Sequence, residues 1–220
     1  MPSAYGTNSM NTGIALVPAR DDILRLIILQ KRLLDVAELS PILSTEANLP
    51  HITILQGKTP NPICSPFELE ELLKTAISRD QTTGLFVTIK SLQYVSPGWY
   101  FLTIHHNPVI HALHNNAFSL CKKRLFVNQH DLTKDLSGYT ERQKKNYLRY
   151  GYRFIGKDFS PHFTLGRTPN KKPFPQEALL DSIASSIIKN RLRIDKLTLY
   201  VMGENGSHTS QLSSITLPTP

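Results

Sequence analysis

The chain has 220 residues, of which 40% are hydrophobic, and it carries a formal net charge of +8 at pH 7. This length suffices for one large domain or two small lobes, and the ordinary hydrophobic fraction excludes a wholly disordered chain. The positive charge suits an anionic partner such as nucleic acid or a phosphorylated small molecule, although many basic proteins have no such partner.

Neither a membrane-spanning segment nor a secretion signal is predicted. No apolar run approaches the ~18 residues of a membrane span, and the polar segment 1–12 lacks the basic and apolar regions of a signal peptide. Cys64 and Cys121 have neither the spacing of metal ligands nor that of a disulfide framework. We therefore expect a cytoplasmic protein without metal or cofactor, in which residues 1–12 are flexible.

Short strands and amphipathic helices alternate along the first half of the chain. Asp21 is the expected cap of the first helix, whose apolar residues recur at helical spacing. Ser65 and Pro66 begin the second helix, because proline is favoured in a first helical turn. In chain order, the pattern predicts a strand at 13–17, a helix at 22–39, a strand at 50–54, a helix at 66–78, and strands at 85–95 and 99–105.

The second half of the chain repeats this alternation after a long insertion at 125–160. Residues 126–160 have the composition of a loop that contains one helix, predicted at 140–149. The remaining predicted elements are a helix at 109–122, a strand at 161–165, a helix at 176–189, a strand at 192–202, a turn at 204–206 and a strand at 211–217.

The pentapeptide Pro-His-apolar-Thr-apolar occurs twice, at residues 50–54 and 161–165, about half a chain apart. Alternate side chains of a strand point to the same face, so His51 lies beside Thr53 and His162 beside Thr164. The apolar residues point to the opposite face and are expected to anchor each strand in a core. We predict an α/β (α+β) protein over 13–217, a single domain of two pseudo-symmetric lobes. Each lobe has a small antiparallel-rich sheet with covering helices, and an active-site groove lies between them.

Two histidines that face one phosphate suit phosphodiester chemistry. The unperturbed pKa of histidine is close to neutral, so one ring can accept a proton while the other donates one to the leaving oxygen. Threonine hydroxyls can donate hydrogen bonds to the non-bridging oxygens, where negative charge develops. This mechanism requires no metal.

The paired motifs resemble those of the 2H phosphoesterase superfamily, which includes 2′-5′ RNA ligase-like proteins and cyclic nucleotide phosphodiesterases. The strand at 13–18, the run at 159–167 and the strand at 197–202 agree with this, and the resemblance covers about residues 13–217. It implies metal-independent cleavage of 2′,3′-cyclic phosphates or 2′-5′ phosphodiesters of RNA ends or nucleotides, with possible 2′-5′ ligation. The insertion at 125–160 departs from the shortest members and leaves the substrate open.

Carried onto this chain, the resemblance implies that His51 and His162 are the acid–base pair. Thr53 and Thr164 become the phosphate ligands. The resemblance does not assign which histidine is the acid and which is the base.

Tyrosines and cations interleave between residues 139 and 153, where Glu141 is the only acidic residue. Aromatic faces and cations together bind single-stranded nucleic acid, but a solvated helix with packed tyrosines has the same composition. We identify Arg149, Tyr150 and Arg153 as candidate substrate-binding residues.

Arg167 is a fourth candidate for substrate binding. Counting by twos from His162 places its side chain on the other face of the strand, unless the strand twists.

His111 and His114 are one helical turn apart, a spacing that suits a metal ion, but a solvated helix face is the simpler interpretation. Among the remaining residues of interest, His208 is unassigned, Lys122–Arg124 are expected to complement a helix dipole, and Trp99 and Phe101 are expected in the core.

Two alternatives to an RNA phosphodiesterase stay open from the sequence. An RNA-binding or end-sensing module would keep the groove but turn over little substrate. A 2H enzyme could instead act on a cyclic oligonucleotide or on a small-metabolite phosphodiester. In each case the expected partner is a phosphate ester rather than a membrane, and we expect a monomer.

Overall fold

The computed structural model describes residues 9–76, 84–169 and 177–218. Within these ranges seven strands form one antiparallel sheet, in the order β1-β2-β5-β4-β3-β6-β7, and β1 also pairs with β6. The strands are β1 (Met10–Pro18), β2 (Ile52–Thr59), β3 (Leu85–Val95), β4 (Trp99–Ile104), β5 (His162–Arg167), β6 (Arg191–Met202) and β7 (His208–Thr216).

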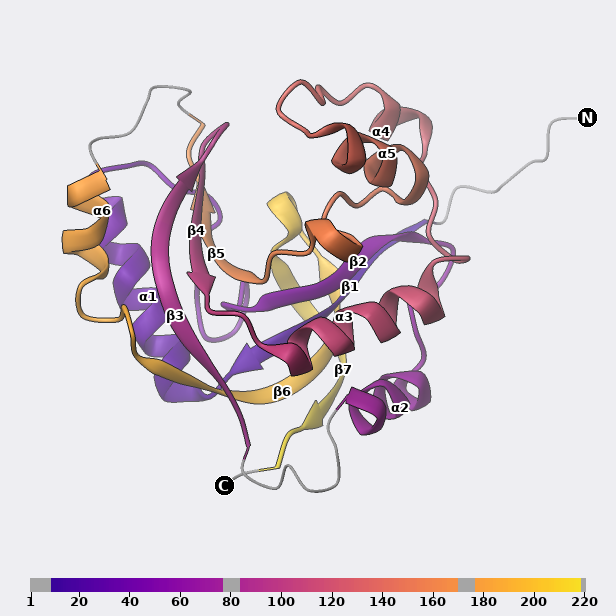
Figure 1. Ribbon diagram of the computed structural model, residues 1–220, viewed down its shortest axis with the longest axis horizontal. Helices are drawn as coiled ribbons and strands as arrows, with labels where there is room; N and C mark the ends of the chain where they lie inside the picture. Colours follow the sequence, from indigo (N-terminus) through magenta and orange to yellow (C-terminus); the bar gives the residue numbers. More distant parts are fainter. Residues whose placement is uncertain (1–8, 77–83, 170–176, 219–220) are drawn as a thin grey trace, which may run out of the picture.

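Strand β6 joins the two halves of the sheet. Its residues 191–194 pair with β3, and its residues 194–201 pair with β1. One half therefore has the order β2-β1-β6-β7 and the other has β5-β4-β3-β6, so β2 and β5 occupy equivalent edges (Figure 1). The predicted fold class is confirmed, with one difference: the two small sheets share β6 and are continuous.

Helices cover the two halves of the sheet separately. In one group, α1 contacts α6, and the pair packs on β5 and β3. In the other, α2 contacts α3, and this pair packs on β2, β6 and β7. A third group (α4, α5 and the 3₁₀ turn η1) belongs to the insertion and lies above β2 in Figure 1. The bounds of all these helices are α1 Arg20–Leu34, α2 Pro66–Ala76, α3 Pro108–Cys121, α4 Gln129–Leu132, α5 Glu141–Tyr150, η1 Gly156–Asp158 and α6 Glu177–Ala184. A second 3₁₀ turn, η2, spans Glu204–Gly206.

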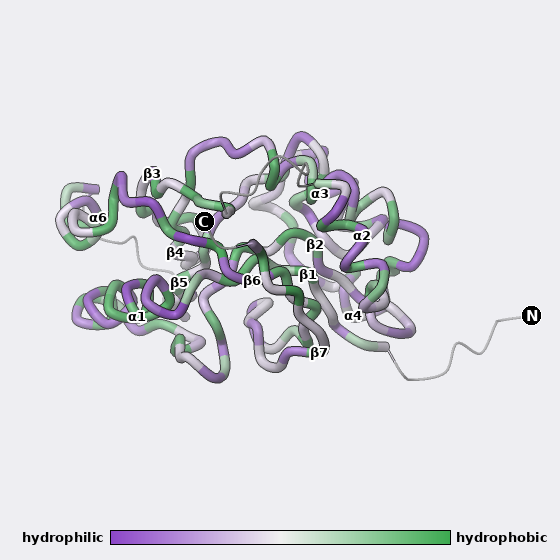
Figure 2. The backbone as a smooth tube through the Cα atoms, turned by 90° about the horizontal axis from the view of Figure 1, so that it is seen from below, coloured by the Kyte–Doolittle hydropathy of each residue, from purple (hydrophilic) through white to green (hydrophobic). Residues whose placement is uncertain are grey.

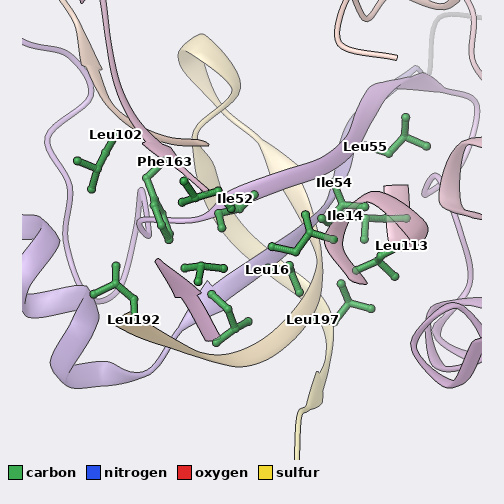
Figure 3. Close-up of a cluster of buried hydrophobic side chains, with 14 of the residues drawn as sticks. Ile14, Leu16, Ile52, Ile54, Leu55, Leu102, Leu113, Phe163, Leu192 and Leu197 are labelled. Atoms are coloured by element: carbon green, nitrogen blue, oxygen red, sulfur yellow. The ribbon is translucent and has the colours of Figure 1, made fainter. Parts of the chain in front are cut away.

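The hydrophobic core lies between the sheet and its covering helices. Hydrophobic residues concentrate in the central strands, whereas α1 alternates between hydrophilic and hydrophobic positions, as expected for a helix with one face exposed (Figure 2). Both His-Thr strands anchor in this core, because Ile52, Ile54, Phe163 and Leu165 have no exposed surface. Figure 3 shows the first three of these among the buried hydrophobic side chains. No helix in the described ranges is both long and apolar enough to span a bilayer.

Four predicted boundaries are wrong because long-range pairing overrides local propensity. Strand β2 continues to Thr59 rather than ending at residue 54, because residues 57–59 pair with β1. The first helix ends at Leu34 rather than residue 39, since Ser40 forms two backbone hydrogen bonds with Arg167, of 3.0 and 2.8 Å. The last helix ends at Ala184 rather than residue 189, because residues 189 and 190 hydrogen-bond to the backbone of Ile89. Strand β1 begins at Met10, so residues 10–12 of the segment expected to be flexible are paired with β2.

Helix α1 has a different cap from the predicted one. Ala19 occupies the N-cap position without a side-chain bond, and Asp21 lies within the first turn. Asp22 accepts a hydrogen bond of 2.8 Å from the backbone N–H of Arg193 and so ties α1 to β6. By contrast, the helix predicted at 140–149 is present as α5, and Thr140 begins it with a capping box.

Smaller differences concern the ends of other elements. Strand β7 begins at His208, three residues before the predicted strand, and the insertion contains α4 and η1, which the sequence did not predict. The predicted helix ends at 77–78 and at 176 lie outside the described residues.

Candidate active site

The two His-Thr motifs meet where β2 approaches β5. Ile52 pairs with Phe163 in an antiparallel bridge, and both side chains point into the core. His51 precedes Ile52 and His162 precedes Phe163, so both histidines project from the face opposite the core. Their rings are close enough that a charge on His51 lowers the pKa of His162.

Each histidine is oriented by the same local hydrogen bond. Nδ1 of His51 donates to the carbonyl oxygen of Leu49 at 2.8 Å, and Nδ1 of His162 donates to that of Ser160 at 2.6 Å. Because a carbonyl oxygen can only accept, both neutral rings carry their proton on Nδ1. The Nε2 atom of each ring is therefore the atom that can take up or deliver a proton.

Burial keeps both rings neutral in the free protein. Desolvation lowers the pKa of His51 and that of His162 to about 4, and the backbone hydrogen bond offsets only part of this effect. For His162, the nearby Arg153 lowers the pKa further. An anion bound between the rings would have the opposite effect, because a negative charge favours the protonated imidazole.

Two aromatic residues that the sequence analysis did not assign pack beside His51. Its ring centroid lies 5.2 Å from that of Tyr200 and 5.8 Å from that of His208. Tyr200 and His208 are themselves stacked at 4.6 Å with 8° between their planes, and Nε2 of His208 contacts Oγ1 of Thr198 at 3.1 Å. His208 thus supports the N-terminal motif from a buried position, although its own sequence context lacks the Thr-apolar pattern.

Tyr200 also contacts the threonine of the first motif. Its hydroxyl group forms a hydrogen bond with the side chain of Thr53 and donates one of 3.4 Å to Oε1 of Gln56. The Tyr200 ring fits here because Gly13 on β1 has no side chain: a Cβ atom at Gly13 would lie 2.6 Å from the ring. A glycine inside the buried strand at 13–17 was the sequence signal for this close approach.

The surroundings of His162 come from β4 and from the insertion. Its ring stacks on Phe101 with 3.8 Å between the centroids, and the Phe154 ring packs edge-on with its centroid 5.6 Å away. Arg153 lies over the Phe154 ring at 4.4 Å, which places its guanidinium next to the site. Phe101 is buried, as predicted, but it packs on His162 at the site face of β4 instead of joining the main hydrophobic cluster.

Thr164 follows His162 by two residues and lies on the same face of β5. It pairs with Phe101 on the neighbouring strand β4, and the Phe101 ring stacks on His162. The Thr164 hydroxyl and the His162 imidazole therefore share one surface. The geometry thus places all four motif residues, His51, Thr53, His162 and Thr164, around the meeting point of β2 and β5.

No protein-family model matches the chain, and no curated protein matches it significantly. Among solved structures, the chain is similar to TT0787 of Thermus thermophilus, with a TM-score of 0.57 and 13% identity over 96% of this chain and 99% of that one. The chain has the 2H phosphoesterase fold. Weaker matches include apo LigT of E. coli (TM-score 0.48, 14% identity, 96% and 98% coverage) and Usb1 of Kluyveromyces marxianus (0.41, 14%, 96% and 98%).

Within this 2H phosphoesterase fold, Arg167 lies on the same face as the motif residues, contrary to the count by twos. Tyr100 pairs with Gly166 but Phe101 pairs with Thr164, so one extra residue in β5 shifts the alternation. The guanidinium of Arg167 lies 5.3 Å from the ring of Trp99. Gly166 has φ 140°, a value that suits glycine and permits this irregularity.

Arg149 and Tyr150 lie apart from the histidines. The Tyr150 ring packs edge-on against Phe118 of α3, with 5.0 Å between the ring centroids. Arg149 and Tyr150 line a separate pocket with Lys122 and Lys123. Of the four candidate substrate-binding residues, the structure thus brings Arg153 next to His162 and places Arg167 further along the same strand.

His114 is neither a metal ligand nor part of a solvated helix face. It is buried and stacks on Phe159 at 3.9 Å. Its Nδ1 donates to the carbonyl oxygen of Ile54 at 2.7 Å, and its Nε2 accepts from the backbone N–H of Gly156 at 3.1 Å. His114 therefore attaches the insertion to β2. Across the residues that the structure describes, no group of three or more His, Cys, Asp or Glu side chains is placed to hold a metal ion.

Proposed function

We propose that this protein is a metal-independent phosphodiesterase that opens 2′,3′-cyclic phosphates or cleaves 2′-5′ linkages at RNA ends. The observation that carries the proposal is the convergence of His51 and His162, each held by the same Nδ1 bond to the carbonyl two residues earlier. A binding module has no need for two imidazoles in matched tautomers, whereas proton transfer to and from a phosphodiester requires them.

The reaction needs one neutral ring and one protonated ring. The neutral histidine takes a proton from water through Nε2 as the water oxygen attacks phosphorus. The protonated histidine delivers its proton to the sugar oxygen as the bond between that oxygen and phosphorus breaks. Because the pKa of each ring is about 4 in the free protein, the proton on the acid enters with the anionic substrate, whose charge stabilises it.

Thr53 and Thr164 are proposed to bind the non-bridging phosphate oxygens. Each hydroxyl lies two residues after its histidine on the same strand face, so both flank the space in front of the Nε2 atoms. In the free protein Tyr200 donates to Gln56 and accepts from Thr53, so binding of phosphate by Thr53 requires the Tyr200 hydroxyl to turn and donate to Oγ1 of Thr53 instead. Arg153, beside His162, adds a positive charge that suits a phosphate ester.

The proposal is tested by incubating the protein with each of the four 2′,3′-cyclic nucleotides and with 2′-5′ dinucleotides in the presence of EDTA. We expect a nucleoside monophosphate product from the wild type, and formation slower by about 10² to 10⁴-fold from His51→Gln or His162→Gln. If the wild type binds these compounds without turnover, the end-sensing alternative replaces the enzyme.

A further inference from the structure

A pocket lies between the C-terminal ends of α3 and α5, outside the candidate active site. It has a volume of about 400 Å³ and is lined by Lys122, Lys123, Leu125, Arg149 and Tyr150. We propose that this pocket binds the phosphate backbone of a single-stranded RNA whose end occupies the site at His51 and His162. The inference rests on the proposed function and specifies an oligonucleotide, rather than a mononucleotide, as its substrate.

The charge of the pocket is not neutralised within the described part of the chain. The neighbouring Arg124 is engaged by Glu68 through both of its terminal nitrogens. Lys122, Lys123 and Arg149 are exposed, and among the described residues none of them forms an ion pair. No acidic side chain lines the pocket.

Helix dipoles do not account for this much positive charge. Lys122 is the C-cap residue of α3, and Arg149 lies in the last turn of α5, so each cation faces a helix end with a partial negative charge. A helix end contributes only about half an elementary charge, so two ends offset about one of the three cations. The excess attracts an anion, and the phosphates of RNA supply one at every nucleotide.

An aromatic ring in the same pocket suits a nucleobase. Tyr150 is fixed by its edge-on contact with Phe118, and the guanidinium of Arg149 lies 5.2 Å from its ring. Proteins that bind single strands without sequence preference combine such rings with cations along the backbone. The sequence identified this combination at Arg149 and Tyr150, and the structure joins Lys122 and Lys123 to it from α3.

The separation from the active site fits a strand of several nucleotides. The backbone carbonyl of Tyr150 lies next to Gly57 on β2, 3.5 Å from where a Cβ would stand. His51 immediately precedes the same strand, so the pocket is about 20 Å from His51 at the usual rise of a β-strand. Arg153, beside His162, is three residues after Tyr150 and provides an intermediate cation. A strand of about four or more nucleotides spans such a distance.

The test compares a short and a long substrate with the same reactive end. Lys122→Ala/Lys123→Ala is assayed on a cyclic mononucleotide and on an RNA of about eight nucleotides that ends in a 2′,3′-cyclic phosphate. We expect the KM for the long RNA to rise about tenfold with unchanged kcat, and both constants for the mononucleotide to stay unchanged. For the long RNA, the slope of log KM against the logarithm of the salt concentration should decrease by about 1.4. This is the value expected when two phosphate contacts to a single strand are lost.

Arg20→Ala/Lys31→Ala is the matched control. It removes two exposed cations from α1, on the far side of the molecule from the pocket (Figure 1). If it raises the KM for the long RNA as much as the α3 variant does, the effect is one of net charge and the pocket is not an RNA site. An equal change for both substrates in the α3 variant also overturns the inference.

Binding without turnover separates this inference from the proposed function. Fluorescence anisotropy with a labelled RNA of about eight nucleotides carrying a 3′-phosphate requires no chemistry. Weaker binding by Lys122→Ala/Lys123→Ala, but not by the α1 control, supports the pocket even if no cyclic phosphate is cleaved. Equal binding by wild type and variant refutes the pocket even if the enzyme is active.

Discussion

Ile52 pairs with Phe163 at the one point where β2 meets β5 in the described residues, and this pair brings the two histidine motifs together. Both side chains are fully buried, so the residues before and after them turn toward the opposite face. The convergence of His51 and His162 is thus a consequence of hydrophobic anchoring on the other side of the same strands. The following predictions test what these groups do.

Removal of either imidazole should abolish most of the turnover. We expect His51→Gln and His162→Gln each to lower kcat on a 2′,3′-cyclic nucleotide by about 10² to 10⁴-fold, the usual contribution of one acid–base group. Steady-state kinetics measure this, with circular dichroism to verify folding. His106→Gln, an exposed histidine outside the site, should leave kcat unchanged. Full activity of either motif variant would contradict the mechanism.

The threonine hydroxyls should contribute in the transition state more than in substrate binding. Thr53→Val and Thr164→Val retain the shape of the side chain, and each is expected to reduce kcat by about 10²-fold. Thr216→Val, at an exposed position of β7, serves as the control. A rise in KM with unchanged kcat would assign the hydroxyls to ground-state binding instead.

The hydroxyl group of Tyr200 should matter through Thr53. Tyr200→Phe keeps the ring that stacks on His208 and removes only the atom that bonds Thr53 and Gln56. We expect kcat to fall by about tenfold, because the hydrogen bond between Tyr200 and Thr53 is lost. In the Thr53→Val background the same substitution should have little further effect, which kinetics of the double variant will measure. Additive losses would place Tyr200 in a separate role.

Gly13→Ala tests the close approach that seats Tyr200. The new methyl group would lie 2.6 Å from the tyrosine ring in a strand without free space, so we expect a loss of about 1–3 kcal/mol in the free energy of unfolding. Urea denaturation measures it. Gly138→Ala is the matched control, because nothing lies within 4 Å of the added Cβ. Equal stability of the two variants would show that Tyr200 moves aside at no cost.

The fold should lose stability in mild acid. Burial lowers the pKa of His114 and that of His208 to about 4, from 6.5 in the unfolded chain. Between these values the unfolded state binds more protons than the folded state, so the free energy of unfolding falls as the pH decreases from about 6.5 to 4. Thermal denaturation at pH 7, 5.5 and 4.5 measures this.

A histidine variant checks the cause of that pH dependence. His114→Gln should be less stable than the wild type at pH 7 and show a shallower decline toward pH 4.5. His106→Gln should follow the wild type throughout. A transition temperature independent of pH over this range would contradict the assignment.

Much of the fold was predictable from local sequence. The period-2 and helical patterns predicted every strand of the sheet, six of them to within a few residues, and the main helices. The repeated pentapeptide also predicted that His51 and His162 share their strand faces with Thr53 and Thr164. These features depend on near neighbours along the chain, whose alternation is set by backbone geometry.

Other features depended on contacts between distant residues. A bulge in β5 opposite β4 decided which face Arg167 occupies. The docking of the insertion buried His114, and the pairing of β7 with β6 placed His208 beside the site. The pocket between α3 and α5 likewise joins cations about 25 residues apart in the sequence. The sequence by itself determined the chemistry that each strand carries, because alternation is local. Only the tertiary structure decided which groups meet, because sheet register and packing are set by burial of the whole core.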